Sequence, residues 1–219
     1  MKKGKDFWGP PVWIMFHILC IVLKSGNIKD LIRFMELLSK LIPCDYCKMN
    51  LIKKLKAYPP QPYMTSPEKA FFYSYMIHDL ANQHITSHTK ETKTSPPFDN
   101  AFGYYMSLSQ DPKYWGPPIW TSIHIFAATL TPENAEYYKE FLFLLVKLLP
   151  NEQSRKTLLT ILNKHDIDSY LRSNHDAFYY SFKIHDIVNK QHHKKSPLFE
   201  DVKSFYFSAL GEECNDCKV

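Results

Sequence analysis

The sequence predicts an all-α protein, and three observations carry that prediction. Only 6 of the 219 residues are glycine, and no segment shows the period-two alternation of a half-buried strand. Apolar side chains recur at intervals of three and four residues, as they do on one face of a helix. Aromatic residues make up 15% of the chain, which supplies a packed core and excludes a disordered chain.

A repeat of about one hundred residues sets the domain organisation. The segment from Trp8 to Trp13 recurs from Trp115 to Trp120, an offset of 115 − 8 = 107. The offset falls to 196 − 95 = 101 after a contraction in a polar loop. We therefore predict a tandem duplication with two modules and a tail, at residues 6–108, 113–210 and 211–219.

The first two helices of a module have clear sequence boundaries. Pro10 and Pro11 predict the start of the first helix, because proline fits the first turn, and this helix runs to about Leu23. The second helix has apolar residues at a 3.6-residue period and ends before Pro43.

The sequence also predicts where the other three helices of a module begin. A third helix begins near Cys44 and continues through Leu55. Pro67 opens a fourth helix with an aromatic buried face, and a short segment near 98–105 closes the unit. Each module is thus predicted to be a four-helix bundle with a short fifth helix.

Charge and hydropathy exclude two classes of function. The formal net charge is only +5 and the lysines are scattered, so we predict no nucleic-acid binding. An apolar run from Val12 to Leu23 follows several lysines, as in a signal peptide. It is shorter than the ~20 residues of a membrane span, and a second copy lies in mid-chain. We therefore predict a core helix, with no signal peptide and no membrane span.

Four of the five cysteines form two C-x-x-C pairs. Cys44 and Cys47 open a helix, where the helix dipole and unpaired backbone N–H groups favour a thiolate. Cys214 and Cys217 lie in a polar tail, and Cys20 lies on an apolar helix face as a packing residue. The two pairs are typical of a dithiol relay, but a four-cysteine zinc site or a non-catalytic scaffold would also accommodate them.

A set of polar and aromatic residues recurs in both modules. His17 lies in mid-helix near Trp13, while His78 and Asn82 are one helical turn apart and share a face. Their recurrence predicts a ligand pocket in the first module and a possible second pocket in the other, formed by Trp120, His124, His185 and Asn189.

These motifs resemble the Erv/ALR family of FAD-dependent sulfhydryl oxidases, which large DNA viruses also carry. The family patterns are G-x-x-x-W-x-x-x-H, P-C-x-x-C and H-N-x-V-N. The matching residues are Gly9, Trp13 and His17 for the first pattern, Pro43, Cys44 and Cys47 for the second, and His78, Asp79, Ala81 and Asn82, in part, for the third.

This sequence departs from the family pattern at several positions. Gln83 and His84 replace lysines that usually follow the third motif, so Lys90 or Lys93 is expected to contact the cofactor phosphates instead. In the second module, residues 151–154 occupy the place of the C-x-x-C. The resemblance therefore implies a degenerate second module that pairs with the first as an intramolecular pseudo-dimer, which would allow the chain to be a monomer.

The resemblance also implies an activity and a cofactor. Electrons would pass from thiol-containing protein substrates or a thioredoxin-like carrier through the shuttle pair Cys214 and Cys217 to Cys44, the more accessible sulfur of the redox disulfide. They would continue through Cys47 to FAD and to dioxygen, which yields hydrogen peroxide. The residues expected to bind FAD are Trp8, Gly9, Trp13, His17, His78, Asp79 and Asn82.

The resemblance also suggests a compartment. A viral enzyme of this family would act late in infection, in the host cytoplasm, the viral factory or the virion. No metal is expected.

Overall fold

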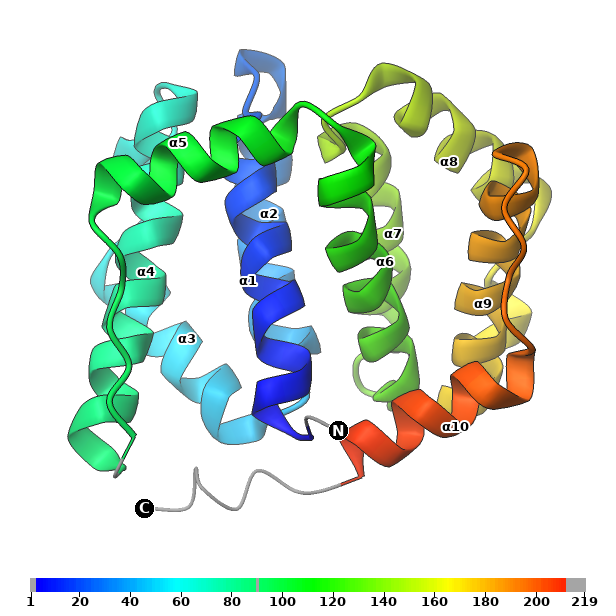
Figure 1. Cartoon of the computed structure of the whole chain (residues 1–219). Coiled ribbons are helices and arrows are strands. Elements are labelled where there is room, and N and C mark those ends of the chain that lie inside the picture. Colours follow the sequence, from blue (N-terminus) through cyan, green and yellow to red (C-terminus); the bar gives the residue numbers. More distant parts are fainter. Residues whose placement is uncertain (1–2, 90, 212–219) are drawn as a thin grey trace.

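The computed structural model describes residues 3–89 and 91–211. Throughout this part of the chain the regular structure is helical, which confirms the all-α prediction (Figure 1). Short 3₁₀ turns connect some of the helices. The helices of the first half are α1 (Lys5–Ile21), α2 (Ile28–Leu41), α3 (Asp45–Ala57), α4 (Pro67–His88) and α5 (Phe98–Ser109).

The second half repeats this order of helices. The first four begin at the same offset from their counterparts, as in 112 − 5 = 107, and the last at 199 − 98 = 101. These are the two offsets found in the sequence, so the repeat is also a repeat of helix boundaries. The helices are α6 (Pro112–Ala128), α7 (Ala135–Leu148), α8 (Glu152–Lys164), α9 (Asn174–Gln191) and α10 (Phe199–Leu210).

The start of α1 differs from the prediction. The helix begins at Lys5, so that Pro10 and Pro11 lie inside it. Its first turn closes on Gly4, whose carbonyl accepts from the Trp8 N–H at 3.1 Å and whose φ of 53° favours glycine. Pro10 and Pro11 have no backbone N–H, so two helical hydrogen bonds are missing near the start of α1. The helix nevertheless continues through both residues.

The starts of α3 and α4 agree with the prediction. Cys44 is the residue before α3, and its sulfur accepts the Cys47 backbone N–H. Ser66 precedes α4, and its hydroxyl oxygen accepts the Lys69 N–H at 3.2 Å. Both side chains satisfy a backbone donor that the first helical turn leaves unpaired.

The two halves pack through their central helices. In Figure 1, α1, α2, α6 and α7 occupy the centre, with α3 and α4 on one side and α8 and α9 on the other. Helix α1 contacts α6, α2 contacts α7, and one apolar core runs through both halves. Phe34 and Phe141, which are fully buried, meet in this core at 6.2 Å between ring centroids. These two residues are equivalent positions of the repeat.

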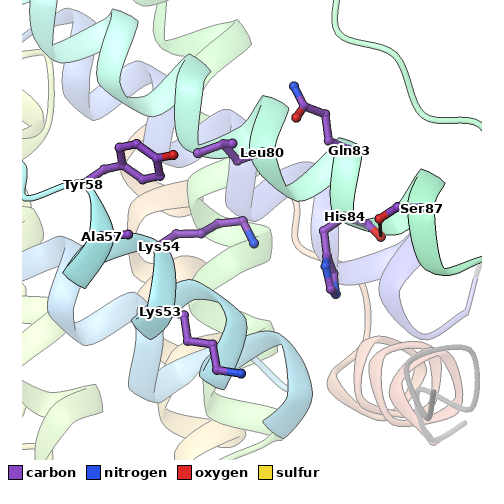
Figure 2. A pocket seen from close by; sticks show the side chains of 8 residues that line it. All are labelled: Lys53, Lys54, Ala57, Tyr58, Leu80, Gln83, His84 and Ser87. Carbon is purple, nitrogen blue, oxygen red and sulfur yellow. Dashed lines mark hydrogen bonds between the residues drawn. The ribbon is translucent and has the colours of Figure 1, made fainter.

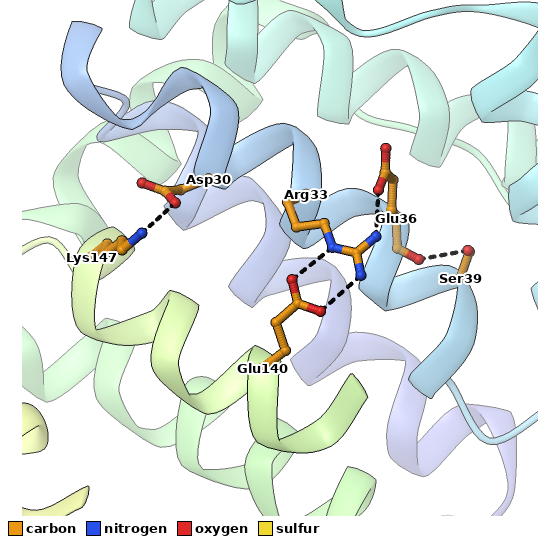
Figure 3. Close-up of polar contacts among 6 residues, drawn as sticks. All are labelled: Asp30, Arg33, Glu36, Ser39, Glu140 and Lys147. Carbon is orange, nitrogen blue, oxygen red and sulfur yellow. Dashed lines mark hydrogen bonds and ion pairs between the residues drawn. The ribbon is translucent and has the colours of Figure 1, made fainter. Parts of the chain in front are cut away.

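Polar contacts border the α2–α7 interface (Figure 3). Arg33 donates two hydrogen bonds to Glu140, at 2.7 and 2.8 Å, and Lys147 donates to Asp30 at 2.8 Å. Arg33 and Glu140 are 41% and 39% exposed. At that exposure an ion pair contributes about 0–1 kcal/mol, so the pair orients the two helices more than it stabilises them.

The same helices are short or polar compared with membrane spans. None in the described ranges has both the length and the apolar character needed to cross a bilayer.

Candidate active site

A cavity of about 440 Å³ lies among α1, α3 and α4 in the first half. This volume is within the range of small-molecule sites. It brings together residues that are far apart in the chain. Seven of the residues predicted from the sequence line it, namely Trp8, Gly9, Trp13, Cys47, His78, Asn82 and Lys93.

One wall of the cavity is a stack of rings backed by a hydrogen-bonded relay. Trp13 lies parallel to His78, with centroids 4.1 Å apart and planes 7° apart. Behind this pair, His17 Nε2 lies 3.0 Å from His78 Nδ1, and His17 Nδ1 lies 2.8 Å from the Ser74 hydroxyl. The sequence motif therefore forms one connected unit across α1 and α4.

The Ser74 hydroxyl fixes the direction of this relay. It donates its proton to the Phe71 carbonyl at 2.8 Å, so it must accept from His17 Nδ1–H. Burial, followed by the charge of His78, lowers the pKa of His17, and burial lowers the pKa of His78 to about 4. Both rings are therefore neutral at pH 7. His17 Nε2 accepts from His78 Nδ1–H, which leaves His78 Nε2 as a hydrogen-bond acceptor.

The redox pair lies at the start of α3. The Cys44 sulfur accepts the Cys47 backbone N–H at 3.2 Å, and Cys47 lines the cavity. Cys44 is only 5% exposed, whereas Cys47 is half-buried. The expectation that Cys44 is the more accessible sulfur is therefore wrong for this conformation, because Cys44 packs into the apolar core at the end of α2.

A lysine shares the cavity with Cys47. Cys47, Asn50 and Lys54 line it from one face of α3, with Lys54 Nζ donating to the Asn50 side chain at 2.9 Å. Burial lowers the pKa of Lys54, the negative charge of a Cys47 thiolate opposes this shift, and Lys53 adds to it. A thiolate on Cys47 and the Lys54 ammonium therefore stabilise each other.

The loop after α4 forms the edge of the cavity. Its Lys93 lines the cavity, and Glu91 pairs with Lys93 at 3.3 Å and with Lys5 of α1 at 3.4 Å. Hydrogen bonds between Thr86 and the Lys93 backbone hold the loop on α4. Of the two lysines expected near the phosphates, Lys93 is thus at the cavity, and Lys90 lies outside the described residues.

Two tyrosines of the cavity were not singled out in the sequence. The Tyr46 hydroxyl lies 2.6 Å from His84 Nε2 and joins α3 to α4, and both residues line the cavity. Tyr105 of α5 also lines it and lies 4.8 Å from His17 between ring centroids. Tyr105 has an equivalent, Tyr206, at the 101-residue offset, and that recurrence was a signal that could have identified it.

One predicted residue of the described chain is not part of this arrangement. Asp79 does not line the cavity, and its carboxylate accepts from the Gln83 amide at 2.6 Å. Cys214 and Cys217 lie outside the described residues.

The second half keeps the relay. Trp120 and His185 stack at 4.2 Å with planes 3° apart, and His124 lies 2.9 Å from His185 and 2.8 Å from the Ser181 hydroxyl. Burial lowers the pKa of His124 to about 3 and that of His185 to about 4.

Helix α8, the counterpart of α3 in the second half, differs from α3 at the positions that line the cavity. Ser154 and Ile161 replace Cys47 and Lys54, and Ile161 and Leu158 of α8 are each 4% exposed. Their counterparts on α3, Lys54 and Leu51, line the cavity of the first half. The second half has thus lost the thiol and the cation and has apolar side chains in their place.

Known proteins match less than half of the chain. The model of the Erv1 / Alr family matches residues 10–101. A FAD-linked sulfhydryl oxidase from a Tick/Malawi isolate of African swine fever virus is 29% identical over 101 residues, which cover 44% of this chain and 83% of the relative. The same enzyme from a Pig/Kenya isolate is 28% identical over the same shares. No solved structure matches the chain. Residues 10–101 therefore match the Erv1 / Alr family, and the chain is homologous to the viral FAD-linked sulfhydryl oxidases over 44% of its length.

Proposed function

We propose that the protein is an FAD-dependent sulfhydryl oxidase that forms disulfide bonds in thiol-containing proteins and reduces dioxygen to hydrogen peroxide. The observation that carries the proposal is that Cys47 and the Trp13–His78 stack line one cavity. The viral relatives bear the name of this enzyme, which agrees with the proposal.

The residues of the cavity fit FAD. Stacked rings offer a flat wall to a flat ring system. A Cβ at Gly9 would meet no atom within 4 Å, so glycine leaves this part of the cavity wall open. Lys93 supplies positive charge suited to the phosphates. We assign Trp8, Gly9, Trp13, His78, Asn82 and Lys93 to FAD binding, with His17 as the residue that orients His78.

The chain prepares a dithiol for oxidation. The backbone N–H of Cys47 donates to the Cys44 sulfur, and both sulfurs lie at the positive end of the α3 dipole. Lys54 adds a nearby ammonium that favours Cys47 as a thiolate. FAD, when bound, accepts two electrons from such a dithiol and delivers them to dioxygen. Cys214 and Cys217 are assigned as the shuttle that exchanges with this pair.

Flavin content tests the proposal. We expect the purified protein to be yellow and to release about one FAD per chain on denaturation. The first half combines the relay with Cys47 and an open cavity, whereas Ser154 and the buried Ile161 replace Cys47 and Lys54 in the second half. Absorbance of the released flavin against protein concentration gives the ratio. Two FAD per chain would show that the second relay also binds flavin, and a colourless protein that yields zinc to a chelator would support the four-cysteine zinc alternative.

Lys54 is expected to activate Cys47. In Lys54→Met the thiolate loses the ammonium of Lys54, with which its charge interacts, so alkylation of reduced Cys47 at pH 7 should slow by about threefold to tenfold, while Lys54→Arg should retain most of the rate. Mass spectrometry of iodoacetamide-treated protein over time measures this. Equal rates in Lys54→Met and the unaltered protein would contradict the role.

We also propose that the two halves form a pseudo-dimer in cis. In a two-fold symmetric interface, a residue near the axis meets its own equivalent. Phe34 contacts Phe141, and Arg33 contacts Glu140, and each pair is related by the repeat. This is the contact pattern that a duplicated dimer retains, and it supports module boundaries at 6–108 and 113–210.

The remaining assignments follow from the activity. We propose thiol-containing proteins or a thioredoxin-like carrier as electron donors. For a viral source, we propose the host cytoplasm, the viral factory or the virion as the place of action.

A further inference from the structure

A basic pocket lies on the outer side of α3 and α4, next to the cavity (Figure 2). Lys53 and Lys54 line it from α3, and His84 and Ser87 line it from α4. Lys54 and His84 also line the cavity that holds Cys47. The lining residues include two lysines and no carboxylate, so the pocket presents uncompensated positive charge beside the redox site.

The electrostatics of His84 reflect this charge. Burial lowers the pKa of His84, and the positive charges of His88, Lys54 and Lys53 lower it further. Neutral His84 therefore remains able to accept from the Tyr46 hydroxyl, while the lysines supply the positive charge.

The two lysines that line the pocket from α3 are not repeated in the second half. At the 107-residue offset, Lys53 and Lys54 become Thr160 and Ile161, and His84 becomes Gln191. The equivalent surface of the second half has lysines at other positions, Lys164 in place of Ala57 and Lys190 in place of Gln83, so the two halves differ in where the positive charge lies.

The described chain ends close to this region. The Gly4 N–H donates to the Ala209 carbonyl at 2.9 Å, which fixes the end of α10 to the start of α1. The next residue of α1, Lys5, lines the same cavity as Cys47. From Gly211, three residues to Cys214 and six to Cys217 can span at most about 10 and 20 Å. The segment that follows Gly211 therefore starts beside the cavity.

That segment is acidic. Glu212, Glu213 and Asp216 surround Cys214 and Cys217, with only Lys218 of opposite sign. We propose that segment 212–217 docks on the pocket of Lys53 and Lys54, and that this charge pairing delivers its two sulfurs to Cys44 and Cys47. The inference rests on the proposed oxidase function and assigns the docking surface of its shuttle.

The docked segment would transfer electrons by thiol–disulfide exchange. One tail thiolate attacks the Cys44–Cys47 disulfide and forms a mixed disulfide, while the other sulfur of that pair leaves as a thiolate. The second tail thiolate then attacks the mixed disulfide. The tail ends as a disulfide and the Cys44–Cys47 pair as a dithiol, with two electrons and two protons transferred.

Charge reversal on the full-length, flavin-loaded protein tests the docking surface. Lys53 lies outside the cavity, so Lys53→Glu should leave oxidation of dithiothreitol unchanged, because a small dithiol reaches Cys44 and Cys47 without the tail. Oxidation of reduced ribonuclease, a protein substrate, should fall by about threefold to tenfold and lose much of its salt dependence. The matched control is Lys164→Glu on α8, which should leave both rates unchanged.

Reversing the charges of the tail tests the same contact from its other side. Glu212→Lys, Glu213→Lys and Asp216→Lys together should slow ribonuclease oxidation alone and restore it when combined with Lys53→Glu. Equal ribonuclease rates for Lys53→Glu and Lys164→Glu would overturn the docking proposal. Unchanged ribonuclease oxidation in Cys214→Ser/Cys217→Ser would instead refute the shuttle, and failure of the unaltered protein to oxidise dithiothreitol would refute the oxidase.

Discussion

Cys47→Ser should abolish thiol oxidation while the protein stays folded and yellow. Cys47 is the sulfur that lines the cavity, and serine keeps its size but cannot form a disulfide or a thiolate. Loss of a nucleophile of this kind lowers turnover by about a thousandfold or more. Oxygen consumption with dithiothreitol measures the loss, and visible absorption reports bound flavin.

Cys20 provides the matched control for this experiment. It is fully buried in α1, and burial raises the pKa of its thiol far above the ordinary range, so it is inert. The equivalent buried position of the second half is Ala127. Cys20→Ala should therefore retain turnover at a modest cost in stability. Substantial turnover in Cys47→Ser, or its loss in Cys20→Ala, would show that the sulfurs have been assigned incorrectly.

Acidification should destabilise the protein well before its carboxylates are protonated. The pKa values of His17, His78, His124 and His185 are all lowered by burial, so these rings stay neutral in the native state. In the unfolded chain they take up protons as the pH falls below about 6.5. The unfolded state then binds more protons than the native state. The free energy of unfolding must therefore fall with pH, by up to about 1.4 kcal/mol per pH unit for each histidine.

Urea unfolding between pH 7 and pH 4.5 measures this slope. Above pH 4.5 the ion-paired carboxylates contribute little, because Arg33 lowers the pKa of Glu140 and Lys190 lowers that of Asp186. His124→Asn removes one buried histidine and should reduce the slope, whereas the exposed His192→Asn should not. A free energy of unfolding that stays constant over this interval would contradict the neutral relay.

The repeat explains which features of the protein could be predicted from sequence. Trp13, His17, His78 and Asn82 were identifiable because each recurs in the second copy, and the structure places three of them at one cavity with His17 directly behind. The start of α1 was missed because the preference of proline for a first turn is local, whereas Gly4 closes that turn earlier.

Other site features could not be found by comparing the two copies. The pairing of Tyr46 with His84 and the placement of Lys54 beside Cys47 involve residues that the second copy has replaced. These contacts join side chains of α3 to the cavity or to α4, so they depend on how α3 is placed. Helical periodicity predicts that α3 exists but does not predict its placement.

The Arg33–Glu140 contact has a consequence for how the two halves can diverge. If the first half paired with an identical copy through the same surface, Arg33 would face Arg33, and two guanidinium groups would repel where a cation and a carboxylate now bond. Linking the copies in one chain lets each side of the contact evolve separately. Opposite charges then favour pairing between the two different halves over pairing between two identical halves. The duplicated chain therefore disfavours association of its first half with the first half of another molecule.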